Sequence, residues 1–190
     1  DANTAILSGD SMLVLAYHRM LQCDADKQPE VMSLFTETAL EIGEGQQYDM
    51  EFENRNDVTE AEYIEMIRLK TSVLLACALK IGAILAGASS EDADNLYKFG
   101  EQMGLAFQLQ DDLLDVYGDP KVFGKAVGGD ITCNKKTYML INAFQRANDN
   151  QRAELERWVT AKDFDRNEKV AAVTDIYNQI GIRQICEEKI

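Results

Sequence analysis

The sequence predicts an all-α protein, and three observations support that fold class. Apolar residues recur at three- and four-residue spacing through nearly every segment, which is typical of helices that bury one face. Only two prolines, Pro29 and Pro120, interrupt the 190 residues. No segment carries a convincing strand pattern. One helical domain over residues 1–190 is therefore the economical prediction.

The periodicity divides the chain into helical segments. In chain order they cover residues 6–20, 29–48, 59–70, 71–88, 89–117, 136–147, 150–160 and 168–188. In the first, residues 8–10 mark a bend or a tight packing point. The second has Pro29 near its first turn, where proline is well tolerated. The third opens with Thr59 and Glu62 at capping-box spacing and ends near Lys70.

The fourth and fifth segments carry the strongest signals. Residues 71–88 are apolar on most faces, so we expect this helix to be central and enclosed. Lys80 and several small residues within it favour a buried helix over a membrane span, and we expect no stable membrane insertion. The fifth segment opens at Ser89 or Ser90 with acids in its first turn, and a Gly-Asp-Pro sequence stops it after Tyr117.

The C-terminal part of the chain changes character twice. Residues 121–135 are Gly-rich and lack periodicity, so we expect a loop there. Helices then resume, and the last is broken near Gly181. Because the chain begins at Asp1 without Met and ends at Ile190 in mid-pattern, we expect the domain to be truncated at both ends.

Charge and composition exclude several classes of function. The formal net charge is −14, which disfavours nucleic-acid binding because that needs clustered Lys and Arg. The four cysteines, Cys23, Cys77, Cys133 and Cys186, lie far apart without a CxxC pair. We therefore expect reduced thiols and a cytoplasmic protein. The one histidine, His18, cannot by itself supply a zinc site or a catalytic triad.

Three acids lie within an apolar stretch of the fifth segment. Asp111 and Asp115 are one turn apart on one helical face, since successive residues are rotated by about 100°. Asp112 lies beside them, and Gln108 is three positions before Asp111. Carboxylates this close repel unless a cation lies between them, and Mg²⁺ with oxygen ligands is the usual remedy. The alternative is an amphipathic helix whose polar face only meets solvent.

The loop after these acids favours the metal-binding explanation. Its glycines allow tight backbone turns, and its lysines supply cations within reach of the carboxylates. These residues are Gly118, Gly124, Gly128, Gly129, Lys125, Lys135 and Lys136. The combination suits a highly anionic ligand that arrives with a metal. A diphosphate fits, because Mg²⁺ bridges carboxylate to phosphate and lysines neutralise the remaining oxygens.

Two further groups add weaker signals. Lys70-Thr71 stands at a predicted helix junction before the apolar fourth segment. Gly45-Gln46, followed by Asp49, places polar groups on an otherwise apolar helix. Each has an ordinary explanation by itself, with Lys70 as a solvated surface lysine and Gln46 as a satisfied polar residue in a helix contact.

Together these motifs resemble the trans-isoprenyl diphosphate synthase (polyprenyl synthetase) family. They are Gly45-Gln46 with Asp49, Lys70-Thr71, Phe107-Gln108 before Asp111-Asp112-Leu113-Leu114-Asp115, and Gly124-Lys125 leading through Gly129-Asp130 to Asn134-Lys135-Lys136-Thr137. The opening residues 5–10 are similar to the segment after the family's first Asp-rich motif. The resemblance covers almost the whole chain, and it implies a bundle of long helices around a central apolar cavity.

The resemblance implies roles for the charged residues. Asp111, Asp112 and Asp115 would bind Mg²⁺, with Asp111 a direct ligand and the other two completing the shell directly or through water. The allylic diphosphate would be held by Lys70, Lys125 and Lys135.

It also implies roles for the polar residues around them. Thr71 and Gln108, with the backbone oxygen of Lys70, would stabilise the developing allylic cation. Gln46 would contribute to substrate binding, and Gln46 and Asp49 would support the cavity and the region of Lys70.

The implied reaction condenses isopentenyl diphosphate with an allylic diphosphate. The product would be an all-trans farnesyl, geranylgeranyl or longer diphosphate, with Mg²⁺ as cofactor and the leaving diphosphate as proton acceptor. The family resemblance also implies a homodimer. Small residues in the fourth segment, namely Ala76, Ala78, Gly82, Ala83 and Ala86, would let a long chain pass or would allow close helix packing.

The chain departs from the family pattern at its N-terminal end. The family's first DDxxD motif and the Arg pair after it are absent and would precede Asp1, so we expect the 190 residues alone to be inactive. One alternative function is a class I terpene cyclase, which has an Asn/Ser/Glu motif where this chain has three Asp. Another is a non-catalytic subunit of a heteromeric prenyl synthase, which would not need an intact metal and lysine set.

Overall fold

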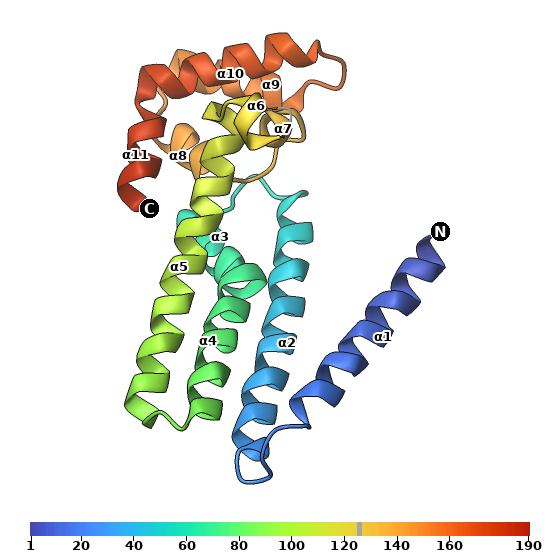
Figure 1. The fold of residues 1–190 in the computed structure, drawn as a ribbon. Helices are drawn as coiled ribbons and strands as arrows, with labels where there is room; N and C mark the ends of the chain where they lie inside the picture. Colours follow the sequence, from blue (N-terminus) through green and yellow to red (C-terminus); the bar gives the residue numbers. More distant parts are fainter. Residues whose placement is uncertain (125–126) are drawn as a thin grey trace.

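The computed structural model describes residues 1–124 and 127–190, and this described part is helical with no strand. In chain order the elements are α1 (Ala2–Met20), α2 (Gln28–Phe52), α3 (Glu60–Ile67), η1 (Arg68–Ser72), α4 (Val73–Ala86), α5 (Ser90–Tyr117), α6 (Pro120–Phe123), α7 (Gly129–Thr132), α8 (Tyr138–Arg146), α9 (Asp149–Thr160), α10 (Arg166–Ile180) and α11 (Ile182–Lys189). The long helices α2, α4 and α5 run side by side, and α8 to α11 gather around the C-terminal end of α5 (Figure 1). The predicted all-α fold class is confirmed.

The first helix, α1, lies apart from the rest of the bundle. It meets α2 near the turn that joins them, where the rings of Tyr17 and Phe35 touch edge to face, and then points away from it (Figure 1). The predicted bend or packing point at residues 8–10 is wrong. The helix runs through it unbroken, and a Cβ on Gly9 would meet no atom of the described chain within 4 Å. Exposed apolar side chains cover α1: Ile6, Leu7, Met12, Leu13, Val14 and Leu15.

Local chemistry fixed several helix ends as the sequence predicted. Thr59 accepts a hydrogen bond from Glu62 N, and the Glu62 carboxylate accepts one from Thr59 N, which completes the capping box of α3. Ser89 caps α5 by accepting from Asp92 N. Gly181 separates α10 from α11 with a φ of 82°. That left-handed conformation favours glycine.

The third and fourth predicted helices form one continuous helix, so the predicted junction at residues 70–71 is wrong. The chain makes a single π-helical turn there, η1, in which Val73 N donates to Arg68 O. A π-helical turn holds more residues than an α-helical turn, so it shifts the phase of the buried face along the helix. In a sequence such a phase shift looks like the end of one helix and the start of another.

The next helix, α4, is central but not enclosed, which corrects the sequence prediction. One side packs against α5 and α2, whereas Leu74 and Leu85 on the other side are 50% and 43% exposed. Its small residues divide accordingly, since Ala76 is buried and Gly82 is exposed. The continuous helix Glu60–Ala86 is apolar enough to cross a membrane by length and composition alone, with 44% of its most apolar window buried in the protein. A core helix of a water-exposed domain gives the same signal.

Glycines let the neighbouring helices approach η1 closely. A Cβ on Gly104 of α5 would lie 2.5 Å from Ser72 Cα, and one on Gly45 of α2 would lie 2.3 Å from Lys70 N. Gly100, one turn before Gly104, packs against α4 in the same way. Because a side chain would overlap the backbone at each contact, α2 and α5 are held directly against the turn that carries Lys70.

Two apolar cores stabilise the fold. The larger joins α3 and the C-terminal half of α5 to α8, α9, α10 and α11, and it includes Leu109, Trp158 and Tyr177. The smaller lies between α2, α4 and the start of α5. The predicted loop over residues 121–135 contains two short helices, α6 and α7. The C-terminal half of α5 packs in the larger core, so this core holds in place the part of the helix that carries the predicted acids.

Replacing Gly104 with alanine should lower the free energy of unfolding by about 1–3 kcal/mol, because the added methyl group overlaps the backbone of Ser72. Gly43→Ala in α2 is the matched control. No described atom lies within 4 Å of its Cβ position, so helix propensity should leave stability unchanged or raise it by up to about 1 kcal/mol. Urea unfolding followed by circular dichroism measures both variants. Equal unfolding free energies would contradict the close-packing explanation.

Candidate functional site

The last turns of α5 carry the three predicted acids in two different environments. Asp111 and Asp115 are half-buried and lie one turn apart. Asp112 is only 1% exposed, because this side of the helix faces the larger core together with Leu109 and Leu113. The acids therefore divide into an accessible pair and one carboxylate enclosed in protein.

The enclosed carboxylate of Asp112 has a protein donor on each oxygen. Tyr63 of α3 donates its hydroxyl hydrogen to Oδ2, and Lys135 Nζ donates to Oδ1 at 3.1 Å. Burial raises the pKa of Asp112, and these two donors oppose the rise. Burial would lower the pKa of Lys135, but the carboxylates of Asp112 and Asp130 outweigh it and raise that pKa above its ordinary value. Metal binding by Asp112 stays a prediction, and in the structure both of its oxygens already have protein partners.

A further acid, Asp130 of α7, joins the same group. Its Oδ2 lies 3.5 Å from Lys135 Nζ, and its backbone N–H donates to Asp115 Oδ2 at 2.9 Å. Burial, with Asp112 and Asp115 close by, raises the pKa of Asp130 to about 6, although Lys135 opposes the rise. In the sequence Asp130 is part of a motif but has no predicted role of its own. The sequence feature that could have indicated a role for Asp130 is its position in the Gly- and Lys-rich loop after the three acids.

The π turn η1 brings Lys70 to this region. Lys70 Nζ donates to Asp49 Oδ2 of α2 at 2.6 Å, a contact through which Asp49 supports Lys70. Asp49 also contributes to the raised pKa of Lys135, so the two lysines share one acidic environment. Gln46, in contrast, is exposed, and its side chain has no hydrogen-bond partner among the residues that the structure describes. Its neighbour Gly45 makes the contact with the Lys70 backbone.

Three predicted site residues remain. Thr71 follows Lys70 in η1, and Gln108 lies one turn before Asp111 on α5, with both side chains half-buried. Because η1 and α5 are in contact, these residues lie on adjoining segments. Lys125 lies outside the described residues, so its predicted part in holding a diphosphate has no structural description.

The accessible acids fit a magnesium ion that is shared with a substrate. Within residues 1–124 and 127–190, no group of three acidic, His or Cys side chains is arranged to hold a metal. Mg²⁺ often takes only one or two protein carboxylates and completes its octahedron with water and phosphate oxygens. Asp111 has no hydrogen bond or ion pair in the described part of the chain, and it lies one turn from Asp115. These two residues supply such a carboxylate pair.

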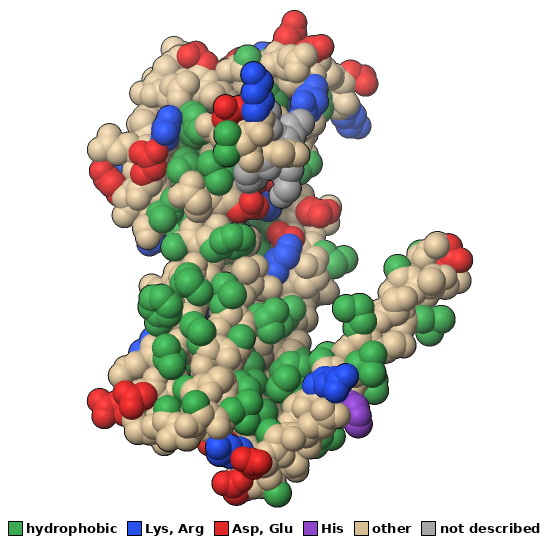
Figure 2. Space-filling view, in the orientation of Figure 1, with side chains coloured by type: hydrophobic (Ala, Val, Ile, Leu, Met, Phe, Trp, Pro, Cys, Tyr) green, Lys and Arg blue, Asp and Glu red, His purple; other side chains and the backbone are tan. Residues whose placement is uncertain are grey.

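One row of side chains on α5 connects this pair to an apolar surface. At four-residue spacing before Asp111 lie Phe107, Met103 and Phe99, which are 61%, 42% and 60% exposed. Residues four apart are neighbours on a helix surface, so the row is continuous. Figure 2 shows hydrophobic side chains gathered over the long helices, with acidic and basic side chains where these meet the C-terminal part. The site therefore joins a charged end to an apolar one.

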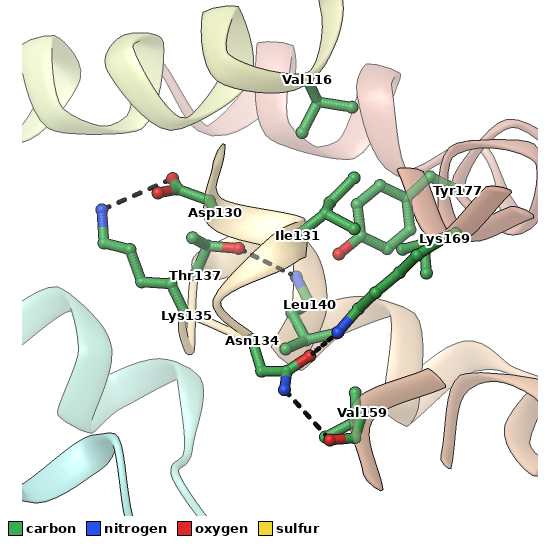
Figure 3. A pocket seen from close by; sticks show the side chains of 11 residues that line it. Val116, Asp130, Ile131, Asn134, Lys135, Thr137, Leu140, Val159, Lys169 and Tyr177 are labelled. Carbon is green, nitrogen blue, oxygen red and sulfur yellow. Dashed lines mark hydrogen bonds and ion pairs between the residues drawn. The ribbon is translucent and has the colours of Figure 1, made fainter. Parts of the chain in front are cut away.

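Hydrogen bonds of the Asn134 side chain fix the backbone just before Lys135. Asn134 has a φ of 57°, a left-handed conformation that asparagine tolerates better than most residues. Its side chain accepts from Lys169 Nζ at 2.6 Å and donates to Val159 O at 3.0 Å (Figure 3). Lys169 of α10 is 1% exposed, although lysines are rarely buried without a partner. Lys169 was not predicted from the sequence, because nothing in its local pattern distinguishes it.

Two cavities lie near Asn134. The first is lined by Asp130, Asn134, Lys169 and Tyr177 among others (Figure 3). Its volume of about 10 Å³ has room for one water at most. The second, of about 600 Å³, opens between residues 56–59, α8 and α9. Of the loop lysines named above, Lys136 lines the larger cavity, whereas Asp111, Asp115, Lys70 and Lys135 do not. It is therefore separate from the acid and lysine group.

Comparison with known proteins identifies the family of the chain. A family model described as Polyprenyl synthetase matches residues 1–179. A short chain isoprenyl diphosphate synthase of Methanothermobacter thermautotrophicus is 39% identical over 178 residues, which are 93% of this chain and 54% of that protein. A crystal structure of a geranylgeranyl pyrophosphate synthase superposes with a TM-score of 0.93 at 43% identity, over 100% of this chain and 59% of that one.

A further solved structure is that of a complex with ligands. It is a geranylgeranyl pyrophosphate synthase from Corynebacterium glutamicum complexed with isoprenyl diphosphate and magnesium. Its TM-score is 0.86 at 31% identity, over 98% of this chain and 54% of that one. The chain spans about half the length of the curated relatives it matches.

Lys169→Met should lower the free energy of unfolding by about 2–3 kcal/mol, because the apolar side chain leaves the Asn134 amide oxygen without its charged donor. Lys162→Met is the matched control, since Lys162 is exposed and makes no hydrogen bond or ion pair in the described structure. Chemical denaturation of both variants gives the comparison. Similar losses in the two would show that the Asn134 contact is not what stabilises this region.

Proposed function

The chain belongs to the polyprenyl synthetase family, and on that premise we propose that the protein carrying it is a Mg²⁺-dependent prenyltransferase. It condenses isopentenyl diphosphate with an allylic diphosphate and releases an all-trans prenyl diphosphate of farnesyl, geranylgeranyl or greater length. The observation that carries the proposal is the row on α5 in which exposed Phe99, Met103 and Phe107 lead into Asp111 and Asp115.

The two ends of this row match the two ends of an allylic diphosphate. Its hydrocarbon tail gains free energy by leaving water for an apolar surface. Its diphosphate carries several negative charges, which need cations close by. Lys70 and Lys135 supply these cations near the carboxylate end of the row. The site therefore suits an amphipathic anion better than a wholly polar nucleotide or a neutral lipid.

The lysines neutralise charge as the bond to diphosphate breaks. Asp49 orients Lys70, and Asp112 with Asp130 orients Lys135, so neither ammonium group has to reorganise at that moment. We assign Lys125 to the same task by its place in the family motif. The departing diphosphate accepts the final proton, and no side chain is needed as a general base.

The metal would be held by Asp111 and Asp115, and by its place in the family motif Asp112 would complete the shell through water. When bound there, Mg²⁺ supplies positive charge that stabilises the leaving diphosphate. The magnesium and isoprenyl diphosphate complexed with the Corynebacterium glutamicum synthase support both the metal and the substrate class. Asp112 serves this site by holding Lys135.

The polar residues beside the lysines complete the proposed site. Thr71 and Gln108, with the backbone oxygen of Lys70, direct partial negative charge at the allylic cation. Their positions on adjoining segments, η1 and α5, support that assignment. We assign Gln46 to substrate binding because it lies on α2 next to Gly45, which contacts η1.

We also propose a homodimer in the cytoplasm. The exposed apolar side chains of α1 supply a surface that a second subunit would shield from water. The four cysteines are free thiols in the structure, which is compatible with a reducing compartment.

The full-length protein that carries this sequence should extend an allylic primer with isopentenyl diphosphate when Mg²⁺ is present. Chromatography of dephosphorylated products against all-trans standards measures both activity and chain length. Chelation with EDTA should abolish product formation, and added Mg²⁺ should restore it. If no primer from five to twenty carbons is extended, the proposed function is wrong. Activity only after addition of another prenyl synthase subunit would favour a non-catalytic role.

Asp111→Asn in that protein should lower kcat by on the order of 100-fold, because loss of one metal-binding carboxylate removes several kcal/mol of charge stabilisation. Glu91→Gln is the matched control. Glu91 lies in the first turn of the same helix, far from the acid pair, and should leave kcat unchanged. Steady-state kinetics at saturating Mg²⁺ compares the two, and near-normal turnover of Asp111→Asn would remove the metal assignment.

A further inference from the structure

The hydroxyl of Tyr63 is the least expected part of the site. Tyr63 has no exposed surface, and its ring packs in the larger core beside Tyr138, at 6.5 Å between ring centroids. Such a ring contributes to stability whether or not it carries a hydroxyl group. The hydroxyl nevertheless points at a carboxylate of the metal-binding motif, Asp112 Oδ2. That contact joins the core to the charged group.

We propose that Tyr63 is a positioning residue, which holds Lys135 in place for the diphosphate by fixing the carboxylate of Asp112. The proposal rests on the proposed function, because it assigns Lys135 to diphosphate binding. It assigns Tyr63 no contact with substrate or metal.

The geometry of Asp112 supplies the mechanism. Its side chain has no exposed surface, so water cannot satisfy whichever oxygen lacks a protein donor. With Tyr63 on Oδ2, the other oxygen, Oδ1, stays directed at Lys135 Nζ at 3.1 Å. Without the hydroxyl, Lys135 is the one donor left among the residues that the structure describes, and the carboxylate turns so that the lysine covers both oxygens. The ammonium group is then drawn toward the core.

Displacement of Lys135 would spread to the accessible side of the site. Lys135 Nζ also lies 3.5 Å from Asp130 Oδ2, and the Asp130 N–H donates to Asp115 Oδ2 at 2.9 Å. An ammonium group drawn toward Asp112 leaves Asp130 and faces the diphosphate less directly. One hydrogen bond in the core thus sets the position of a cation at the surface of the site.

The test compares Tyr63→Phe with Tyr138→Phe in the full-length protein. Both changes remove one hydroxyl from neighbouring buried rings, but only the first removes a donor to Asp112. For Tyr63→Phe the dissociation constant of inorganic diphosphate with Mg²⁺, measured by calorimetry, should rise at least about tenfold. The KM for the allylic diphosphate should rise with it, while the KM for isopentenyl diphosphate stays within about twofold. Tyr138→Phe should match the wild type in all three.

The outcomes separate this inference from the proposed function. A wild-type protein without prenyltransferase activity overturns the function, and the calorimetric and structural measurements still decide the role of Tyr63. Equal diphosphate affinity for Tyr63→Phe and the wild type, at a temperature where both are folded, overturns the inference. A crystal structure of Tyr63→Phe with Lys135 unmoved would do the same. Parallel changes in both tyrosine variants would mean that core packing alone is responsible.

Discussion

The burial of Asp112 is the constraint on which the candidate site depends. A carboxylate without contact to water is stable only when donors satisfy its oxygens. Here the donors are Tyr63 and Lys135, which come from α3 and from the loop after α7. Satisfying one side chain of α5 therefore fixes three segments relative to one another. Because the partners are charged or strongly polar, displacement of any of the three segments would leave a buried group without its hydrogen-bond partner.

Close packing of helix backbones brings Lys70 to the same region as Lys135. Gly45 and Gly104 have no side chain, so α2 and α5 lie directly against η1. The π turn breaks the regular helical hydrogen bonding at Lys70, whose ammonium group pairs with Asp49. Steric fit thus positions the backbone of Lys70, whose ammonium group pairs with Asp49, whereas Lys135 depends on its ion pairs with Asp112 and Asp130. The two lysines reach one acidic environment through independent interactions.

The separation of lysine-paired acids from the accessible pair on α5 would let a protein with a net charge of −14 bind the proposed diphosphate. Acids such as Asp49 and Asp112 are paired with the lysines and hold them in place. Asp111 and Asp115 stay accessible and become attractive to a diphosphate only with a bound divalent cation. Under the proposed function, substrate binding is thereby tied to metal binding, and the exposed apolar row on α5 favours a ligand with a hydrocarbon tail.

The sequence by itself determined the fold class, the helix ends set by local chemistry, such as the capping box at Thr59, and the ordered motifs that indicate the family. These depend on residues a few positions apart. Only the tertiary structure decided that the helix continues through η1, that Asp112 is enclosed, and that Lys169 supports the chain before Lys135. Each of these depends on contacts between segments far apart in the chain, which the periodicity of a single helix does not encode.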